Sequence, residues 1–402
     1  MTEPAPEGAL DDLTVLDLSE GVAGAYCGKL LADYGADVIK VERPGTGDPA
    51  RRHGPFPDGR PHPEKSALFL YLNTNKRGVT LDVAHPRGAA VLRRMVEDAD
   101  VLIETFRPGY LADLGLGYPA LREVNPDLVM TSITAFGQDG PYAGYRSNNL
   151  VALALGGQLG MTGSPDREPL KSAGYQAEYQ AGLHAFGATL AAVFGARIAE
   201  AGQHVDIAMV EVLASVLETA MPYYAYWGKD TGRRRGNIQS AIIGIYPCAD
   251  GYLGVHAMAR NWPALLRLME REDLAEDPRF KEMRDRVQHN DDLEAIIYEW
   301  ASRQRKDEVH RRAVELRAPV VAVHTLADLF ASPQLRARGY FQDVDHPAAG
   351  RLTYPGPPFR MGATPWRAGR APLLGEHNDE VYLGELGLEP EEYRELRELG
   401  VI

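Results

Sequence analysis

The first ordered part of the sequence has the pattern of a strand, a glycine-containing turn, a helix and a second strand. The apolar run Thr14–Leu18 is followed by Ser-Glu-Gly, by a helical pattern from about Ala23 to Tyr34, and by the apolar run ADVIKVE; Gly35 ends the helix. Because one helix returns the chain to the same end of the sheet, the two strands are expected to be parallel. This βαβ unit predicts an α/β fold, and it restricts the folds open to the chain more than any other feature.

Strand and helix patterns continue to alternate through the first half. They are GVTLDV, a helix from about Pro86 to Asp98, VLIET, the helical segment YLADLG, and LVMTSI. This order predicts a Rossmann-like parallel sheet with helices on its faces. Gly21, Gly24 and Gly28 are spaced GxxGxxxG, whereas a dinucleotide-binding turn has GxGxxG, so a nicotinamide cofactor is disfavoured.

A chain of 402 residues is too long for one simple core, so we expect two domains. A linker pattern around Trp227 is followed by the hairpin pattern IYPCADGYLGVHAM, by further helices, and by a Pro- and Gly-rich tail that ends in a short acidic helix. We predict a disordered lead over residues 1–10, the first part of a large Rossmann-like domain over 11–222, a linker with a smaller α+β domain over 223–330, and a return segment over 331–402 that completes the large domain.

Composition and charge exclude several classes of protein. The formal net charge of −13 argues against binding nucleic acid through the overall field. Cys27 and Cys248 lie far apart without a Cys/His cluster, so neither a disulfide framework nor a metal site is expected. The N-terminus lacks the pattern of an export signal, and no apolar run is long enough to span a membrane. We expect a cytoplasmic protein that has no metal and no membrane segment.

Basic side chains occur where the strands of such a sheet would end. Arg43 follows the second strand, Lys76 and Arg77 lie in LNTNKRG, and Arg107 follows VLIET. Loops at the carboxyl ends of parallel strands form the ligand crevice of open α/β sheets, and arginine can bind phosphate through two N–H groups. The pattern predicts a polyphosphate ligand, although each arginine taken alone fits a solvated surface residue equally well.

One carboxylate precedes a long run of small and apolar residues. Glu178 in GYQAEYQAG lies just before a helical pattern from about Ala181 to Ile198, in which alanine and glycine recur mostly at three- and four-residue steps. The first turn of a helix has unpaired N–H groups and the positive end of the dipole, both of which favour a negative charge. Taken locally, Glu178 is interpreted as a charge that caps a buried helix.

Ten short segments occur in one order along nearly the whole chain. They are VLDLSEGVAGAYCGKLLADYGADVIKVERPGTGD, LNTNKRGVTLDV, ADVLIETFRPG, FGQDGPYA, GGQLGMTG, GQHVDIAMVE, YPCADGYLGV, PQLRARGYF, HPAAG and APLLGEHNDEV. With these segments the chain resembles the class III CoA-transferases of the CaiB/BaiF type. That family includes formyl-CoA transferase, carnitine CoA-transferase and α-methylacyl-CoA racemase.

The resemblance implies an interlocked dimer in which both ends of each chain form the large Rossmann-like domain and the smaller domain is inserted between them. It also implies coenzyme A or an acyl-CoA as the bound substrate, with no metal. In this family, groups at seven positions hold the ADP-3′-phosphate of CoA, and Lys76 belongs to the same basic loops. The matching residues are Val22, Ala23, Arg43, Leu72, Asn75, Arg77 and Arg107.

The resemblance also gives Glu178 a role. Transferases of this family use an aspartate four residues before a glycine as nucleophile, and Glu178 stands four residues before Gly182. The carboxylate attacks an acyl-CoA to give a mixed anhydride, CoA attacks the anhydride to give an enzyme thioester, and an acceptor acid reverses both steps. Backbone N–H groups of the loop around Phe136, Gly137 and Gln138 and of the loop from Asn237 to Ser240 are expected to stabilise the oxyanions. The implied activity is that of an acyl-CoA:carboxylate CoA-transferase with glutamate in place of the usual aspartate.

The glutamate leaves other hypotheses open. It reaches about one C–C bond further than aspartate, and a misplacement of about 1 Å can cost about 100-fold in rate. The chain is a transferase, as a homodimer or in a heteromer with a related subunit, or it is a CoA-binding silent subunit without activity of its own. Isomerization or hydrolysis of an acyl-CoA is a third hypothesis. Racemization is disfavoured, because Asn148 or a neighbour stands where that branch has its histidine, and asparagine exchanges no proton at neutral pH.

Overall fold

The chain folds as two compact units. The computed structural model describes residues 8–218, 220–230 and 238–402. The large unit comprises Met1–Gly157, Ser172–Leu217 and Ala337–Ile402, and the small unit comprises Gln158–Lys171 and Glu218–Arg336. Residues 1–7 of the predicted lead lie outside the described residues. The domain boundaries derived from the sequence stay predictions.

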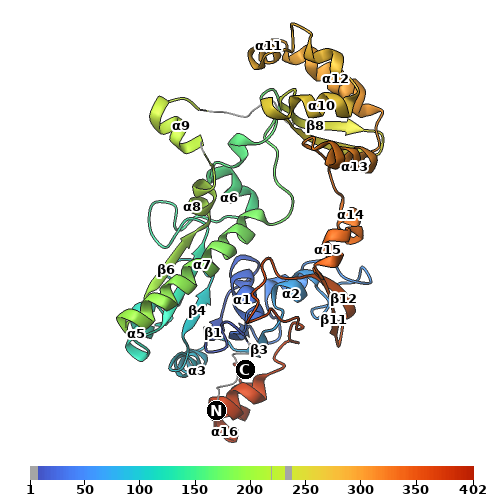
Figure 1. Ribbon diagram of the computed structural model, residues 1–402. Helices are drawn as coiled ribbons and strands as arrows, with labels where there is room; N and C mark the ends of the chain where they lie inside the picture. The colour runs from blue at the N-terminus through green and yellow to red at the C-terminus, as the bar shows by residue number, and fades with distance from the viewer. Residues whose placement is uncertain (1–7, 219, 231–237) are drawn as a thin grey trace. The chain divides into compact units, whose positions relative to one another are not determined.

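A six-stranded parallel sheet forms the centre of the large unit (Figure 1). Its strand order is β3-β2-β1-β4-β5-β6, so the chain builds one side of the sheet from β1 outward and then starts the other side at β4. This order is that of doubly wound, Rossmann-like folds, and it confirms the predicted parallel α/β sheet. The strands are β1 (Thr14–Asp17), β2 (Asp37–Glu42), β3 (Arg77–Thr80), β4 (Val101–Glu104), β5 (Val129–Thr134) and β6 (His204–Ala208).

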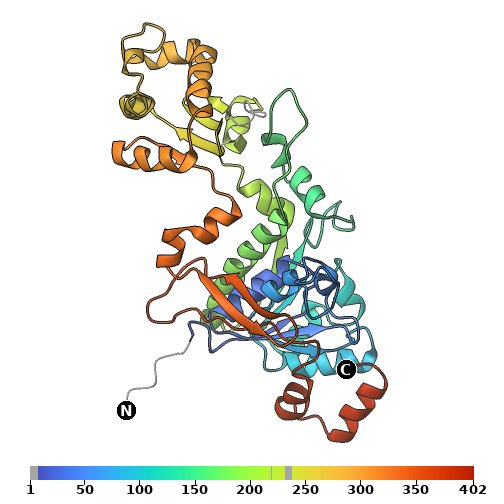
Figure 2. The same cartoon turned by 90° about the vertical axis from the view of Figure 1, so that its right-hand side faces the viewer.

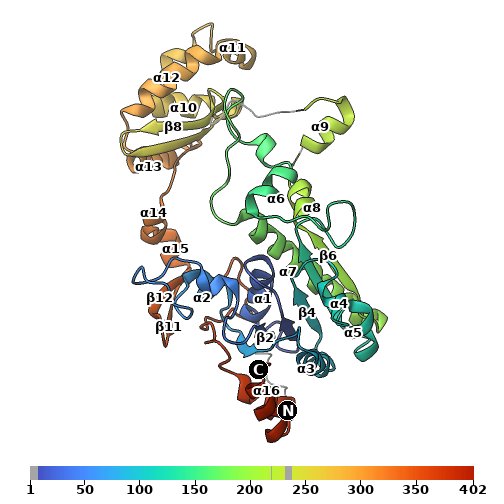
Figure 3. The ribbon, with the colours of Figure 1, turned by 180° about the vertical axis from the view of Figure 1, so that it is seen from behind.

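Helices cover both faces of this sheet, because alternate strand residues point to opposite sides. Val15 and Val101 pack in one apolar cluster with α1 and α7, whereas Leu16 and Leu102 pack in another with α3, α5 and α16 (Figure 3). The helices are α1 (Ala23–Asp33), η1 (Pro49–Arg52), α2 (Ala67–Leu72), α3 (Pro86–Val96), α4 (Tyr110–Asp113), α5 (Tyr118–Val124), α6 (Asn149–Leu155), α7 (Gln176–Ala199), α8 (Met209–Ser215), η5 (Asp379–Glu385) and α16 (Pro390–Glu398).

The C-terminal segment of the chain completes the edge of the large unit beside β3. The Gly78 N–H donates to Nδ1 of His377 at 3.0 Å, and the His377 N–H donates to the Gly78 carbonyl oxygen at 2.9 Å. The sequence predicts an irregular tail from His346 onward, but the structure has a hairpin there, formed by β11 (Phe341–His346) and β12 (Gly350–Pro355) (Figure 2). His346 makes this turn possible, because its ring accepts hydrogen bonds from two N–H groups within the turn.

The small unit contains an antiparallel sheet of order β10-β9-β8-β7 with helices packed against it. The predicted hairpin is present as β8 and β9, with Cys248 paired opposite Gly251. Its elements are η2 (Leu159–Met161), α9 (Ala220–Trp227), β7 (Ile238–Ser240), β8 (Ile243–Cys248), β9 (Gly251–His256), η3 (Ala259–Asn261), α10 (Trp262–Met269), η4 (Glu272–Ala275), α11 (Met283–Gln288), α12 (Asn290–Ser302), α13 (Lys306–Leu316), β10 (Val320–Ala322) and α14 (Leu326–Ala331); α15 (Pro333–Ala337) leads back to the large unit.

Helix α7 is the one described helix whose length and apolar composition would allow it to cross a membrane. A core helix of a globular unit has the same properties. Ala181 and Ala185 of α7 are fully buried in the cluster that also contains Leu30 of α1 and Ile133 of β5. Packing inside the large unit therefore accounts for its apolar composition.

Candidate active site

A cavity of about 840 Å³ lies at the carboxyl ends of β1, β4 and β5 in the large unit. Its lining residues come from the loop after β1 (20–23), the turn of η1 (49–53), the loop after β4 (105–108), the end of β5 with its loop (133–136), the segment 143–148, and the start of α7. The strand order reverses between β1 and β4, and such a switch point is where open α/β sheets bind ligands. The cavity is therefore the candidate active site.

The loop after β1 is held by hydrogen bonds from distant parts of the chain. The Glu20 N–H donates to Oγ1 of Thr105 at 2.8 Å, and the Gly21 N–H donates to Oδ1 of Asp48 at 3.1 Å. Thr105 also donates to the Glu20 carbonyl oxygen at 3.2 Å. These contacts fix the backbone that leads to Val22 and Ala23, so this wall of the cavity is preorganised.

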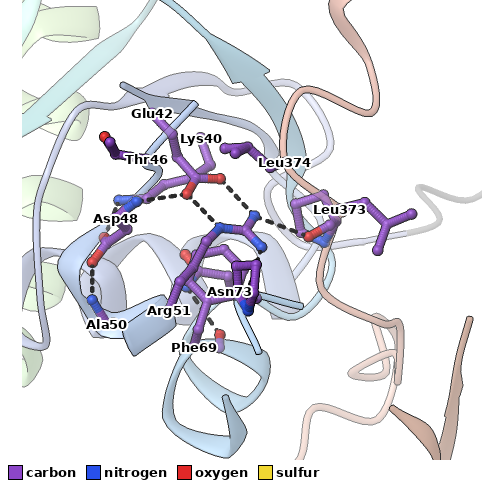
Figure 4. Close-up of polar contacts among 12 residues, drawn as sticks. Lys40, Glu42, Thr46, Asp48, Ala50, Arg51, Phe69, Asn73, Leu373 and Leu374 are labelled. Carbon is purple, nitrogen blue, oxygen red and sulfur yellow. Dashed lines mark hydrogen bonds and ion pairs between the residues drawn. The ribbon is translucent and has the colours of Figure 1, made fainter. Parts of the chain in front are cut away.

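A buried ion pair holds the second wall, the turn of η1. Arg51 donates to both carboxylate oxygen atoms of Glu42 at 2.7 Å, and Glu42 also accepts the Asp48 N–H at 2.8 Å (Figure 4). The same guanidinium lies 3.7 Å from the ring centroid of Phe69 and donates to the Pro372 carbonyl oxygen at 3.3 Å. The C-terminal segment therefore helps to fix a wall that is formed near the N-terminus.

Glu178 is the third residue of α7 and lines this cavity. Its side chain is half-buried, in the helix turn whose N–H groups and dipole favour a negative charge. One turn later, α7 packs backbone to backbone on the loop after β1: a Cβ at Gly182 would lie 2.4 Å from the Ala23 carbonyl oxygen. The glycine four residues after Glu178 therefore allows α7 to approach the residues predicted to hold CoA.

The structure brings five of the predicted site residues to this cavity. They are Val22, Ala23, Arg107, Phe136 and Glu178. Arg43 lies beside it instead, in a smaller cavity of about 70 Å³ at the ends of β1, β2 and β3, and its guanidinium pairs with Glu20 at 3.3 Å. Both cavities are lined by Glu20 and by Phe106, so they are adjacent parts of one crevice.

Six predicted residues are not on the wall of either cavity: Leu72, Asn75, Lys76, Arg77, Gly137 and Gln138. Leu72 is fully buried in an apolar cluster. The Asn75 amide donates to Asp33 at 2.6 Å and to the Arg367 carbonyl oxygen at 3.0 Å.

The charged pair that follows Asn75 is also bonded within the chain. Lys76 is buried against Asp17, and the Arg77 guanidinium is surrounded by Asp37, Glu380 and Glu385. The cations at positions 76 and 77 are thus paired inside the protein, and their contact with CoA stays a prediction.

Two of the N–H groups expected to stabilise oxyanions make hydrogen bonds within the protein, while the second loop expected to do so begins at Asn237, outside the described residues. The Gly137 N–H donates to Oγ1 of Thr134 at 3.0 Å, and the Gln138 N–H donates to Oδ2 of Asp206 at 2.8 Å. Because both N–H groups are bonded within the protein, they are not directed at the cavity. Gly137 has a φ of +89°, which turns the chain back toward β6 and explains why the loop after Phe136 makes these internal bonds.

The last residue of β4, Glu104, has a buried carboxyl group next to the loop after β4. Burial raises the pKa of Glu104 to about 7, and Asp206 adds to the rise, while hydrogen bonds from Ser132 and from the Phe106 N–H oppose it. The Phe106 N–H donates to Glu104 at 2.6 Å. Glu104 therefore joins the end of β4 to the loop that carries Arg107.

Sequence reasoning missed two polar residues of the cavity wall. Arg146 and His53 both line it, and Arg146 is exposed. Arg146 lies in the loop YRSNN, which has no strand pattern before it, so the rule that searches for cations after strands could not find it. Among the described residues, no His, Cys, Asp or Glu side chains form a group that could hold a metal ion.

Comparison with known proteins identifies the class. The chain matches CoA-transferase family III over residues 10–378. It is 33% identical to the succinyl-CoA--D-citramalate CoA-transferase of Chloroflexus aurantiacus, over 100% of both chains. It is 36% identical to subunit BbsE of the succinyl-CoA:(R)-benzylsuccinate CoA-transferase of Thauera aromatica, over 96% of this chain and 97% of that one. The crystal structure of a CAIB/BAIF family protein from Brucella suis matches with a TM-score of 0.85 and 32% identity, over 94% of this chain and 100% of that one.

The chain that forms this Rossmann-like sheet, with a cavity at its switch point, thus belongs to a known class of enzymes. The chain is a member of CoA-transferase family III, as its sequence segments imply. Membership of this family makes it an enzyme that transfers CoA.

Proposed function

We propose that this chain moves CoA between an acyl-CoA and a free carboxylic acid through a covalent intermediate on Glu178. The observation that carries this proposal is the place of the carboxylate: Glu178 lies in the first turn of α7, on the wall of the cavity at the switch point of the sheet. A nucleophile needs a fixed position beside its substrate. In the proposal, CoA lies along Val22, Ala23 and Arg107, and its phosphates reach Arg43 in the adjoining small cavity.

The proposed reaction needs no cofactor besides CoA itself. A Glu178 carboxylate oxygen attacks the thioester carbonyl carbon, the C–S bond breaks, and CoA leaves as the thiolate. The thiolate then attacks the Glu178 carbonyl carbon of the anhydride, which releases the donor acid and leaves a glutamyl-CoA thioester. The acceptor carboxylate repeats these steps in reverse order, so the bond energy of the thioester is conserved throughout.

We infer the substrate class from the cavity and the relatives. The names of both relatives above begin with succinyl-CoA, which makes succinyl-CoA the donor to test first. Succinyl-CoA has a second carboxylate at the far end of its acyl group. The exposed guanidinium of Arg146 lines the same cavity as Glu178 and has the charge to bind that carboxylate. A dicarboxylic acid is therefore the proposed acceptor.

The proposed assembly is an interlocked homodimer. Exposed aromatic side chains on α9 support a surface that another chain covers; Tyr224, Tyr226 and Trp227 are each at least 60% exposed. A heteromer with a related subunit is the alternative, because one relative is itself a named subunit. In that case this chain is either the catalytic or the silent subunit. Both cysteines are free thiols, which supports the reducing cytoplasm as its compartment.

Trapping of the intermediate tests the proposal. The purified protein is incubated with succinyl-CoA, treated with hydroxylamine or borohydride, digested, and analysed by mass spectrometry, with Glu178→Gln as the control. The proposal requires a hydroxamate or alcohol on Glu178 in the wild type and none in the variant. Normal CoA binding without an adduct from any acyl-CoA would instead identify a silent subunit.

A further inference from the structure

Two consecutive asparagines at the start of α6 cap two different helices. Oδ1 of Asn148 accepts the Val151 N–H at 3.1 Å, which caps α6, its own helix. Oδ1 of Asn149 accepts the Ala177 N–H of α7 at 2.9 Å. Nδ2 of Asn149 donates to the Gly174 carbonyl oxygen at 3.1 Å. One amide side chain therefore makes hydrogen bonds to the backbone on both sides of the first residue of α7.

The first turn of α7 depends on these two hydrogen bonds, because its own N-cap residue does not cap it. Its N-cap residue, Tyr175, makes no side-chain hydrogen bond to the helix. Ala177 is fully buried, so its N–H has no access to water and would lack a partner without Asn149. The next residue along the chain is Glu178.

We propose that Asn149 is a positioning residue that sets the direction in which Glu178 leaves the start of α7. This inference rests on the proposed function, in which Glu178 must meet a thioester within the cavity. The carbonyl oxygen of Gly174 and the N–H of Ala177 bracket Tyr175 and Gln176, so fixing both groups fixes the backbone immediately before the nucleophile. Asn149 itself stays outside the reaction.

The rest of α7 is held by other contacts. The Tyr179 N–H donates to the Tyr175 carbonyl oxygen at 2.9 Å, and Gly182 packs on the backbone at Ala23. Loss of the Asn149 amide is therefore expected to loosen the first turn and to leave the helix in place. Such a change alters the geometry of Glu178 more than it alters the fold.

The chemistry of the amide supplies a graded set of variants. Asn149→Ala removes both hydrogen bonds. Asn149→Asp keeps an acceptor for the Ala177 N–H but has no donor for the Gly174 carbonyl oxygen. His85→Ala is the matched control, because Nδ1 of His85 accepts the Arg87 N–H at 3.2 Å and caps α3, a helix that does not line the cavity.

Steady-state transfer from succinyl-CoA and hydrogen–deuterium exchange of the peptide containing Gly174–Glu178 test the inference on the full-length protein. In Asn149→Ala we expect faster exchange in this peptide and a kcat about 10- to 100-fold lower, with little change in the KM for succinyl-CoA. Asn149→Asp is expected to lie between this variant and the wild type. His85→Ala is expected to keep the wild-type kcat and the wild-type exchange of this peptide, although it loses a comparable helix cap.

Each outcome separates the inference from the proposed function. Unchanged exchange in Asn149→Ala, or faster exchange with an unchanged kcat, overturns the positioning role and leaves the transferase proposal in place. If the wild type transfers no CoA, the proposed function fails and the positioning role fails with it. The exchange data then still show whether Asn149 holds the first turn of α7 as a purely structural cap.

Discussion

Nζ of Lys76 lies 2.7 Å from Oδ2 of Asp17, and both side chains are fully buried under the loop after β1. Lys76 also donates to the Ala25 carbonyl oxygen at 2.8 Å and to Oδ1 of Asn73 at 2.9 Å. A cation that the sequence places in a ligand-binding loop is thus bonded on every side within the protein. It joins the end of β1 to the start of α1, and so it supports the wall that carries Val22 and Ala23.

Lys76→Met is expected to destabilise the protein by about 3–5 kcal/mol, because it leaves the Asp17 carboxylate buried with one partner fewer. Chemical denaturation measures this loss. Lys65→Met is the control: Lys65 pairs with the exposed Asp58 at 3.4 Å, so the loss there should stay below about 1 kcal/mol. Equal effects of the two substitutions would contradict the structural role of Lys76.

Substitution of glycine by alanine is expected to have opposite effects on stability at two positions of α7. At Gly182 an added methyl group meets the Ala23 carbonyl oxygen at 2.4 Å, and Gly182→Ala should cost about 1–3 kcal/mol. At Gly187 nothing lies within 4 Å, and Gly187→Ala should stabilise the helix by about 0.5–1 kcal/mol. Thermal unfolding of both variants checks the close approach of α7 to the loop; a gain in stability at both positions would refute it.

Because the pKa of Glu104 is raised in the folded protein, we expect stability to depend on pH. Burial raises the pKa of its carboxyl group from 4.5 to about 7, so the folded state holds this proton more tightly than the unfolded chain does. Stability is therefore lost as the pH rises from about 4.5 through 7, by about 3 kcal/mol in total. Glu104→Gln removes this dependence. The variant should be more stable than the wild type at pH 8 and show no such gain at pH 4, when denaturation is compared across this range.

We expect the loss of Arg107 to weaken CoA binding. Its guanidinium is exposed at the cavity and pairs with the exposed Asp113 at 2.9 Å, a contact that a phosphate group can replace. Arg107→Ala should weaken CoA binding by about 1–3 kcal/mol, measured by calorimetry. Arg122→Ala, which removes an exposed charge on α5 away from the cavity, should leave the affinity unchanged.

The sheet could be predicted from the sequence because each strand is a short apolar run with a turn after it. Thr14–Asp17 and Val101–Glu104 are such runs, and all of their residues except Thr14 are buried. The β11–β12 hairpin was missed because its proline and glycine residues are typical of irregular segments, while the side chain that caps its turn, His346, has no sequence signal.

The candidate site was predictable only in part, for a related physical reason. Glu178, Val22 and Ala23 were expected at the site because their segments resemble those of the family, and all three line the cavity. The partners of Lys76 and Asn149 come from distant parts of the chain, Asp17 and Ala177, and no local pattern shows that these residues meet. Long-range side-chain contacts of this kind decide whether a charged or amide group faces the ligand or the protein.

Turnover with an acceptor acid labelled with oxygen-18 in its carboxylate tests the covalent role of Glu178 most directly. The acceptor oxygen that attacks the glutamyl-CoA thioester remains on Glu178 when CoA leaves with the new acyl group, and the next cycle passes it to the released donor acid. The account predicts oxygen-18 in the peptide that contains Glu178 and in the donor acid, and no turnover in Glu178→Gln. CoA transfer by the wild type without label in that peptide would contradict it.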